Sequence, residues 1–489
     1  MAETLTDDHR DAVLAALAEW MPAQRWFAGK GTTPALRLIG SFDVDSTASE
    51  TTQAADVRVA TWLVLDAGGQ QSKLYQVPLT FRSEALPALA ASLVTTLTPT
   101  RLHVYDGAHD PAYAAALLDL ITADAVTDPS HGVTASGRSQ VAGHPLVTTG
   151  AKVLSGEQSN TSIIIRVEGP GGEPHTPVIC KVFRVLHHGN NPDVVLQSAL
   201  AKAGSTKVPA SIGSVVGQWD DTRMPDGRTS GHLAFAQEFL PGVQDAWRVA
   251  LDAVARDVAE NGHSFIDAAR ALGEATAEIH QTLADVLPTL EPSPDLIAGV
   301  MASMRRRHGG AVREVPELAQ YSAAIEKLFA AAEATPWPRL QRIHGDYHLG
   351  QVLALPNGGW VIVDFEGEPL RPMVERSQPD LALRDIAGML RSFDYVAGSY
   401  GQSLAVASAE SAQNDAVTAA AQWALDARAA FLDGYIARSG FDLHANHALL
   451  DAFEIDKALY EAIYEVRNRP TWLSIPTTAV ARLAGDSGV

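Results

Sequence analysis

Two aspartates in one short segment have the types and the spacing that phosphoryl transfer requires. The segment HGDYHLGQVLALPNGGWVIVDFEGEP begins at His344. It places Asp346 in a turn and Asp364, 18 residues later, at the end of an apolar run. Phosphoryl transfer from ATP needs one carboxylate that orients or deprotonates the acceptor hydroxyl, and a second that holds Mg²⁺ against the phosphates. The segment therefore predicts a site that uses ATP and Mg²⁺.

A glutamine completes the oxygen ligands that the metal would need. Gln351 follows Asp346 by five residues. In protein kinases the catalytic Asp and a metal-binding Asn have the same spacing, and a strand ending in Asp-Phe-Gly follows them. Here Gln351 replaces that Asn and Glu366 replaces that Gly. Mg²⁺ prefers hard oxygen ligands, and Gln keeps the amide oxygen, so both replacements are compatible with metal binding.

A predicted hairpin upstream supplies a lysine for the phosphates. Two β-branched runs, IIIRV and VICKVF, flank the turn GPGGEPHTP and place Lys181 on the second strand, like the kinase lysine that contacts the α- and β-phosphates. The preceding segment GEQSNTSI, which contains Gly156, would cover the phosphates. The segment AQEFLPG (236–242) would link two lobes and offer backbone groups to adenine. The candidate nucleotide-binding residues are Lys181, Ser159, Asn160, Gln237, Glu238 and Phe239.

Each of these residues also has an ordinary structural explanation. A lone lysine in a strand is usually a surface charge, and a lone Asp in a turn is usually a cap, but their joint order favours kinase-like chemistry. The rival is metal-dependent hydrolysis, with His344, His348 and the two aspartates as ligands. Zinc hydrolases usually need a further His cluster, which the sequence lacks. A non-catalytic binding module would not explain the aspartates and Lys181 together. We interpret His344, and similarly His348, as structural residues of the loop.

Composition narrows the class of protein. A chain of 489 residues is expected to form two or three domains, and its formal charge of −20 disfavours nucleic acids and anionic membranes as partners. The single cysteine, Cys180, excludes an internal disulfide, and its apolar surroundings indicate a core residue. The acidic start shows no signal pattern, and no apolar run approaches about 20 residues. We therefore expect a cytoplasmic protein.

The hydrophobic pattern predicts a β-rich half followed by a helical half. In chain order, the expected elements are a helix over 6–20 capped by Thr6, several strands within 35–82, a helix over 108–125 and the hairpin. A short helix with Asn190 or Asn191 as its cap and Pro192 in its first turn follows, and then two more strands. From about Ala246 on, helical periodicity dominates, except around 340–370.

Several blocks of sequence resemble the actinobacterial maltokinases, relatives of the aminoglycoside phosphotransferases, over nearly the full length. These blocks are QRWFAGKG, GEQSNTSI, CKVFR, GNNPD, RIHGDYHLGQVL, VIVDFEGEP, PDLALRDIAGMLRSFDY and DKALYEAIYEVRNRPTWLSIP. The resemblance implies an α+β, bilobal protein-kinase-like fold, with an N-terminal α+β cap domain (1–135), a β-rich N-lobe (136–244) and a helical C-lobe (245–489). It also implies transfer of the ATP γ-phosphate to the C1 hydroxyl of maltose, giving maltose 1-phosphate for α-glucan and glycogen synthesis.

The resemblance assigns roles to the residues of the site. It implies Asp346 as the catalytic base, Gln351 and Asp364 as Mg²⁺ ligands, Lys181 as a phosphate contact, and Glu366 as an aid at the metal or a water molecule. The block YEAIYEVRNRPTW would line the sugar pocket. Pro470 should end the preceding helix and leave Trp472 in a loop, where it would stack on a pyranose face. The candidate substrate residues are His348, Tyr460, Glu461, Tyr464, Glu465, Arg469 and Trp472. The alternative is an ordinary amphipathic helix, with Trp472 in a core beside Leu473 and Ile475.

One position departs from the family pattern, and the resemblance leaves two candidate sugar acceptors. Relatives usually carry a Glu where this chain has Val195, and that Glu would pair with the strand lysine; Asp193, close by in sequence, is the candidate substitute. The actinobacterial glucosamine kinases share this architecture and phosphorylate an amino sugar, so glucosamine, with a 6-phosphate product, is the alternative acceptor. In some organisms a maltokinase associates with a trehalose synthase, which would be a protein partner.

Overall fold

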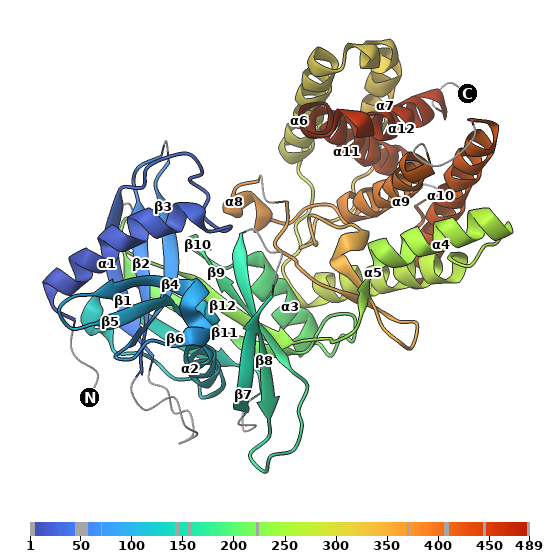
Figure 1. Ribbon diagram of the computed structural model, residues 1–489. Coiled ribbons are helices and arrows are strands. Elements are labelled where there is room, and N and C mark those ends of the chain that lie inside the picture. Colours follow the sequence, from blue (N-terminus) through green and yellow to red (C-terminus); the bar gives the residue numbers. More distant parts are fainter. Residues whose placement is uncertain are drawn as a thin grey trace. The chain divides into compact units, whose positions relative to one another are not determined.

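The computed structural model of the protein describes residues 5–44, 57–69, 71–141, 146–154, 159–221, 224–368, 371–404, 410–443 and 446–486. The chain divides into two units, which are Met1–Ser198 with Pro209–Pro241, and Ala199–Val208 with Gly242–Val489. The first unit is rich in strands and the second in helices (Figure 1). This order confirms the predicted β-rich half followed by a helical half.

The first unit begins with a helix and an antiparallel sheet. The helix is α1 (Asp7–Trp20), and the strands, in sheet order, are β1 (Leu36–Asp43), β2 (Val57–Asp66), β3 (Lys73–Arg82), β5 (Leu102–Asp106) and β4 (Leu93–Leu97). Thr6 caps α1, since its side chain accepts a hydrogen bond from the His9 N–H. The cap and the strands confirm the elements expected over 6–20 and 35–82.

A second antiparallel sheet in the same unit carries the predicted hairpin. Its strands, in sheet order, are β6 (Val133–Ser139), β11 (Ser211–Asp220), β12 (Arg228–Glu238), β9 (Val178–Phe183), β8 (Asn160–Glu168) and β7 (Val147–Val153). β8 and β9 pair directly, with Ile163 opposite Cys180 and Ser162 opposite Lys181. A further short strand, β10 (Val185–Leu186), follows β9 in the chain and pairs with β3 of the first sheet.

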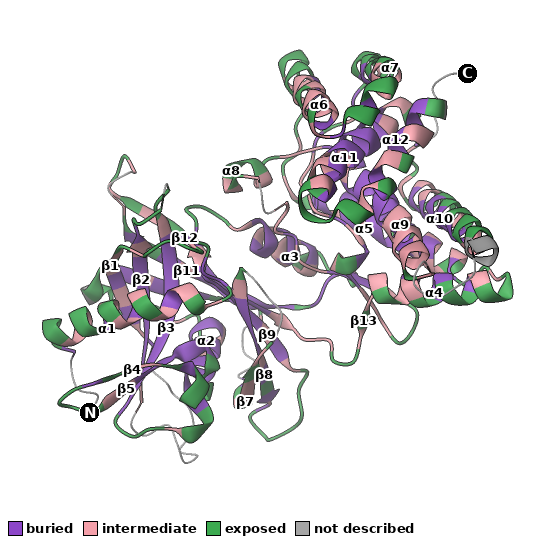
Figure 2. Cartoon of the chain, turned by 45° about the horizontal axis from the view of Figure 1, so that its top comes forward, coloured by how far each residue is buried: buried purple, intermediate pink, exposed green. Residues whose placement is uncertain are grey.

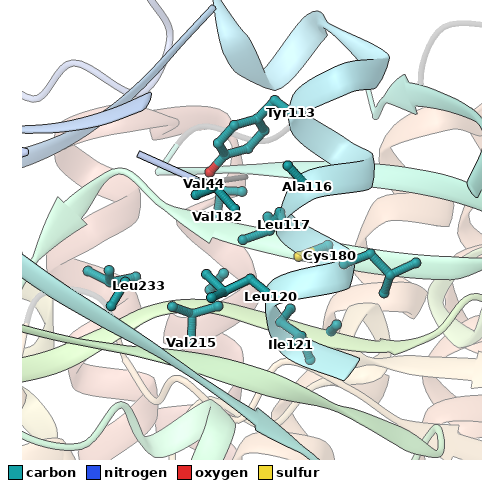
Figure 3. Packing of buried hydrophobic residues seen from close by; sticks show 14 of the residues in the cluster. Val44, Tyr113, Ala116, Leu117, Leu120, Ile121, Cys180, Val182, Val215 and Leu233 are labelled. Carbon is teal, nitrogen blue, oxygen red and sulfur yellow. The ribbon is translucent and has the colours of Figure 1, made fainter. Parts of the chain in front are cut away.

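A buried helix joins the two sheets into one core. α2 (Pro111–Thr122), capped by Asp110, packs against strands of both sheets. Its Leu117 and Ile121 lie beside Cys180 of β9 and Val215 of β11 (Figure 3). A helix that is apolar on all sides is stable only when it is enclosed, which explains the composition of α2. The core thus includes Cys180, as predicted. It contains residues from both sides of residue 135, and the domain boundary expected at that position stays a prediction.

The second unit is almost entirely helical. Its long helices are α4 (Ala246–Glu260), α5 (Ile266–Val286), α6 (Pro294–Glu314), α7 (Ser322–Ala334), α9 (Leu383–Leu404), α10 (Glu410–Ser439), α11 (His447–Asn468) and α12 (Ser474–Asp486). α11 carries many buried residues, whereas few residues of α6 are buried (Figure 2). Across the described residues, every helix is too short or too polar to span a membrane.

A small sheet interrupts these helices at the segment expected to be catalytic. It consists of β13 (Gln244–Asp245), β14 (Val352–Ala354) and β15 (Trp360–Ile362), all antiparallel. The chain between α7 and β14 forms the loop that contains Asp346, and the residues after β15 contain Asp364. A short helix, α8 (Met373–Arg376), precedes α9. The hairpin β14–β15 therefore brings both aspartates to the same end of the small sheet.

Candidate active site

A buried aspartate on α9 holds the start of the loop that contains Asp346. The N–H groups of His344 and Gly345 each donate to one carboxylate oxygen of Asp385, both at 2.8 Å. Asp385 is 1% exposed, and its Oδ2 also lies 3.0 Å from His280 Nε2. α9 can approach because of Gly388, where an added Cβ would lie 2.6 Å from the Tyr347 carbonyl oxygen. The loop backbone is therefore fixed by α9 as well as by its own sequence.

Asp385 is a functional candidate that sequence reasoning missed. The available signal was a single acid within the apolar stretch LALRDIAGML, because buried carboxylates are rare unless they are paired. Burial alone would raise the pKa of Asp385, but the hydrogen bond and charge of His280 and the bond from Gly345 bring the pKa below its usual value. The Asp385 carboxylate is thus ionised and pairs with the loop.

Replacing Asp385 by Asn is expected to lower the free energy of unfolding by about 1.5–3 kcal/mol, since hydrogen bonds to a charged group are lost. A group with a lowered pKa contributes stability that is present above its unfolded value, ~3.9, and is lost as the pH falls. The difference in free energy of unfolding between wild type and Asp385→Asn should therefore shrink below about pH 4. Urea unfolding at several pH values measures both effects. Asp285→Asn, at an exposed position of α5, is the matched control, and an equal loss there would contradict the assignment.

The ring of His344 packs inside the loop. It lies 4.7 Å from the ring of Phe365 and 5.2 Å from that of Tyr347, measured between centroids. Its Nε2 is 3.0 Å from the Val363 carbonyl oxygen, and its Nδ1 accepts a 3.4 Å bond from the Asp346 N–H. Both ring nitrogens are therefore used within the protein. This geometry supports a structural role for His344 and disfavours the metal-hydrolase alternative, which needs a free ring nitrogen.

Gln351 and Asp364 lie side by side. Gln351 Nε2 donates to Asp364 Oδ2 at 3.1 Å, and the Val363 N–H donates to the Gln351 carbonyl oxygen at 3.0 Å. Asp364 has a φ of +66°, a left-handed conformation that is uncommon for residues other than glycine and is often found at functional sites. A carboxylate and an amide oxygen are suitable hard ligands, so these two residues fit Mg²⁺. Glu366, whose carbonyl oxygen accepts from Arg376, lies two residues further on.

A lysine from α11 faces the proposed catalytic base. Lys457 Nζ is 4.0 Å from Asp346 Oδ1 and 5.1 Å from the centre of the Tyr460 ring. Sequence reasoning missed Lys457, although it belongs to the block DKALYEAIYEVRNRPTW. His348, on the same loop, accepts a bond from the Gly350 N–H at 3.0 Å, and burial lowers the pKa of its ring. The His348 imidazole is therefore a neutral neighbour of Asp346.

The acidic residues of the predicted sugar block are held by arginines. Glu461 Oε2 accepts from Arg391 at 2.8 Å, and Glu465 accepts from Arg469 at 2.6 and 2.9 Å. Burial raises the pKa of Glu461, and the Arg391 charge opposes this effect. Glu465 also accepts from the Tyr395 hydroxyl at 2.9 Å. These carboxylates support the surface of α11, which agrees with the amphipathic-helix alternative for part of this block.

The aromatic residues of the block are more accessible. Tyr460 is partly buried, and burial, together with the nearby Glu368 carboxylate, raises its pKa. Tyr464 is 42% exposed. Trp472 lies 6.2 Å from the Tyr395 ring at an interplanar angle of 23°, with the Arg469 guanidinium 4.8 Å from its centre. Tyr460 and Trp472 are thus partly exposed, whereas the neighbouring Glu461 and Glu465 are buried.

The end of α11 differs in one respect from the expectation. The helix ends at Asn468, before Pro470, as the missing proline N–H requires. Trp472, however, lies in a single 3₁₀ turn, Pro470–Trp472, rather than in an open loop. The Trp472 N–H donates to the Arg469 carbonyl oxygen at 2.8 Å, which closes this turn. The expectation of an open loop was wrong because proline suits the first position of a new helical turn.

In the first unit, Lys181 has the substitute partner that the sequence indicated. Lys181 Nζ lies 3.3 Å from Asp193 Oδ2. Asp193 begins α3 (Pro192–Lys202), where Asn191 Oδ1 accepts from its N–H at 2.9 Å and Gln197 Nε2 donates to its Oδ1 at 2.6 Å. The first turn of the helix therefore supplies the carboxylate that a Glu at position 195 would provide. The ion pair holds the lysine side chain although Val195 lacks a charge.

The strand of Lys181 is supported by residues near the N-terminus. Arg184, which is fully buried, donates to both carboxylate oxygens of Asp106 at 3.0 and 3.1 Å and lies 4.7 Å above the Trp26 ring. Gln76 Nε2 donates to the carbonyl oxygens of Phe183 and Leu233, at 3.1 and 2.9 Å. Trp26 belongs to the block QRWFAGKG. The N-terminal part of the chain thus contributes directly to the position of β9.

Replacing Gln76 by Leu is expected to cost about 1–3 kcal/mol of unfolding free energy, because two buried carbonyls lose their donor. Since Phe183 lies two residues after Lys181, we also expect a higher KM for ATP with little change in the KM for the acceptor. Urea unfolding and steady-state kinetics measure these effects. Gln218→Leu, at an exposed position of β11, is the control. Equal KM values for ATP in wild type and Gln76→Leu would show that Gln76 does not position Lys181 for ATP.

The remaining nucleotide candidates lie at the ends of strands. Ser159 and Asn160 stand at the start of β8, where Asn160 Nδ2 donates to Ser159 Oγ at 3.3 Å; Gly156 lies outside the described residues. At the end of β12, after Gln237, the N–H groups of Glu238 and Phe239 donate to the carbonyl oxygens of Ala210 and Pro177. These two N–H groups are therefore used within the protein, and a role of this segment in nucleotide binding stays a prediction.

Comparisons with known proteins show which family the chain resembles. Residues 20–110 match the maltokinase N-terminal cap domain, and residues 196–450, more than half of the chain, match the phosphotransferase enzyme family. A glucosamine kinase of Streptacidiphilus jiangxiensis is 29% identical over 362 residues, 68% of this chain and 75% of that protein. A glucosamine kinase of Mycolicibacterium smegmatis is 27% identical over 359 residues, 69% of this chain and 80% of that protein.

Solved structures show the same fold. A glucosamine kinase (crystal form A) aligns with a TM-score of 0.67 at 22% identity, over 96% of this chain and 98% of that one. A glucosamine kinase in complex with glucosamine, ADP and inorganic phosphate aligns with a TM-score of 0.64 at 23% identity, over 96% and 98%. With the two family matches, these structures establish the kinase-like fold that the sequence predicted. The chain therefore belongs to the phosphotransferase enzyme family and carries the N-terminal cap domain of the maltokinases.

Proposed function

We propose that this protein is an ATP- and Mg²⁺-dependent sugar kinase, with maltose as its acceptor and α-maltose 1-phosphate, a precursor for α-glucan and glycogen synthesis, as its product. The observation that carries the proposal is the pairing of Gln351 with Asp364 at 3.1 Å, beside the loop of Asp346. This arrangement provides a metal-binding pair and a separate carboxylate for the acceptor. The cap domain favours maltose, and the glucosamine kinases among the relatives favour a sugar.

In the proposed reaction, Asp346 orients the acceptor hydroxyl and takes its proton as the new O–P bond forms. The bond between the γ-phosphorus and the bridging oxygen breaks, and ADP leaves. Gln351 and Asp364, with Glu366 nearby, would hold Mg²⁺, which would supply neutralising charge for the phosphates. Lys181, fixed by Asp193, contacts the phosphates. Because such a reaction depends on ATP, we propose a cytoplasmic location, and a trehalose synthase is a candidate partner.

An ADP-release assay with maltose, glucosamine and glucose tests the proposal. Turnover of maltose above that of both monosaccharides, with a strict requirement for Mg²⁺, is the expected result. Higher turnover with glucosamine would replace maltose by the alternative acceptor, as the names of the relatives suggest. If no sugar were phosphorylated while ATP still bound, the sugar-kinase proposal would fail and the non-catalytic binding module would be preferred.

Replacing Trp472 by Ala is expected to raise the KM for the sugar several-fold and to leave the KM for ATP unchanged. The ring is partly exposed beside Tyr395 and Arg469, and we propose that its exposed part contacts the C–H groups of a pyranose. Steady-state kinetics and thermal melting measure the two consequences, and Trp472→Phe should preserve most of the sugar affinity. If Trp472 instead packed with Leu473 and Ile475 as core, Trp472→Ala would cost about 3–5 kcal/mol and impair both substrates.

A further inference from the structure

The cation of Lys457 lies at the point where an acceptor would meet the proposed base. Its Nζ is 4.0 Å from Asp346 Oδ1, and its side chain is 32% exposed. The Tyr460 ring, 5.1 Å away, and the buried neighbours Ala458 and Leu459 hold this part of α11 in place. Any hydroxyl that donates its proton to Asp346 must therefore approach a fixed positive charge.

Carboxylates on both sides of Lys457 in the same helix are already paired with arginines. Asp456 Oδ1 accepts from Arg307 Nε at 2.7 Å. Glu461 accepts from Arg391, which is buried, and Glu465 is held by Arg469, as described above. The ion pairs leave these acids fully engaged, so an ammonium group on a ligand would have to displace an arginine in order to pair with one of them. Such an exchange is costly for a buried pair.

These charges discriminate between classes of acceptor. A neutral sugar places hydroxyl groups beside Lys457, and these groups accept hydrogen bonds from the ammonium. A protonated amino sugar places a second positive charge in the same region, where like charges repel. Resting on the sugar-kinase function proposed above, we propose that Lys457 is a specificity-determining residue that makes the site select uncharged sugars over amino sugars.

The test compares glucose with glucosamine, which differ only in the group at C2. Calorimetric titration of each sugar into the full-length protein with ADP measures affinity without requiring turnover. Wild type is expected to bind glucose more tightly than glucosamine. Lys457→Gln should shift the affinity ratio toward glucosamine by about tenfold, the order expected when one like charge is removed from a partly exposed site. Lys327→Gln, at an exposed position of α7, is the control and should leave the ratio unchanged.

The pH dependence of sugar affinity distinguishes a role of Lys457 in specificity from a merely structural role, which would not change it. In wild type, the preference for glucose should diminish as the amine of glucosamine loses its proton, near the ~8 of an α-amino group, and this dependence should be weaker in Lys457→Gln. Tighter binding of glucosamine by wild type, or an unchanged ratio in Lys457→Gln, would overturn the proposal. Failure of the sugar-kinase function would appear separately, as the lack of ADP release with every sugar.

Discussion

Replacing Asp346 by Asn is expected to lower kcat by about 10²–10⁴-fold, the range that a positioned general base contributes. Asn keeps the size of the side chain, and the loop should keep its shape because its backbone bonds go to Asp385 rather than to the Asp346 carboxylate. The loss should therefore fall on the chemical step. Lys457 would lose its carboxylate neighbour, which is a smaller effect because exposed ion pairs contribute only about 0–1 kcal/mol.

Two measurements separate this outcome from unfolding. Nucleotide should still raise the melting temperature of Asp346→Asn, because the metal-binding pair Gln351–Asp364 is intact. Asp433→Asn removes an exposed carboxylate that pairs with Arg270 on the surface of the same unit, and it should retain wild-type turnover. Near-normal kcat in Asp346→Asn would show that another group takes the proton and that the role assigned to Asp346 is wrong.

Replacing Asp364 by Ala is expected to abolish stabilisation by Mg²⁺–ATP and to lower kcat/KM by more than about 100-fold. Loss of groups that merely support metal ligands already costs 10–100-fold, and here a ligand itself is removed. Gln351 would also lose the acceptor of its 3.1 Å hydrogen bond. The measurements are thermal melting with and without nucleotide and metal, and turnover as a function of Mg²⁺ concentration.

The backbone at Asp364 calls for a matched variant. Its φ of +66° is unfavourable for Ala by about 1–2 kcal/mol, so part of any loss in Asp364→Ala would be conformational. Asn tolerates this conformation, and Asp364→Asn therefore isolates the loss of charge. Both variants should lose metal-dependent stabilisation. If Asp364→Asn kept a normal response to Mg²⁺, the carboxylate would not be the metal ligand, and Glu366 would become the next candidate.

Local spacing determined a large part of this protein from sequence. Two β-branched runs across a turn rich in Gly and Pro predicted the hairpin that carries Lys181, and Gln351 follows Asp346 by only five positions. In both cases the relevant atoms are joined by a short stretch of chain, so strand periodicity and turn chemistry constrain where they can lie. The cap at Asn190 or Asn191 and the Lys181–Asp193 pair were accessible for the same reason, since the two charged residues are only 12 positions apart in the sequence.

Only the tertiary structure decided which residues support and surround that chemistry. Asp385 and Lys457 reach the catalytic loop from α9 and α11, and Gln76 reaches the strand of Lys181 from 107 residues before Phe183. Nothing in the local pattern fixes such contacts, because they depend on how helices and sheets pack. The same reason explains why the sequence did not reveal the partners of Glu461 and Glu465. The helical period places both residues on one face of α11, but only the packing of α9 against α11 shows that this face is buried, with Arg391 bound to Glu461 and Tyr395 to Glu465.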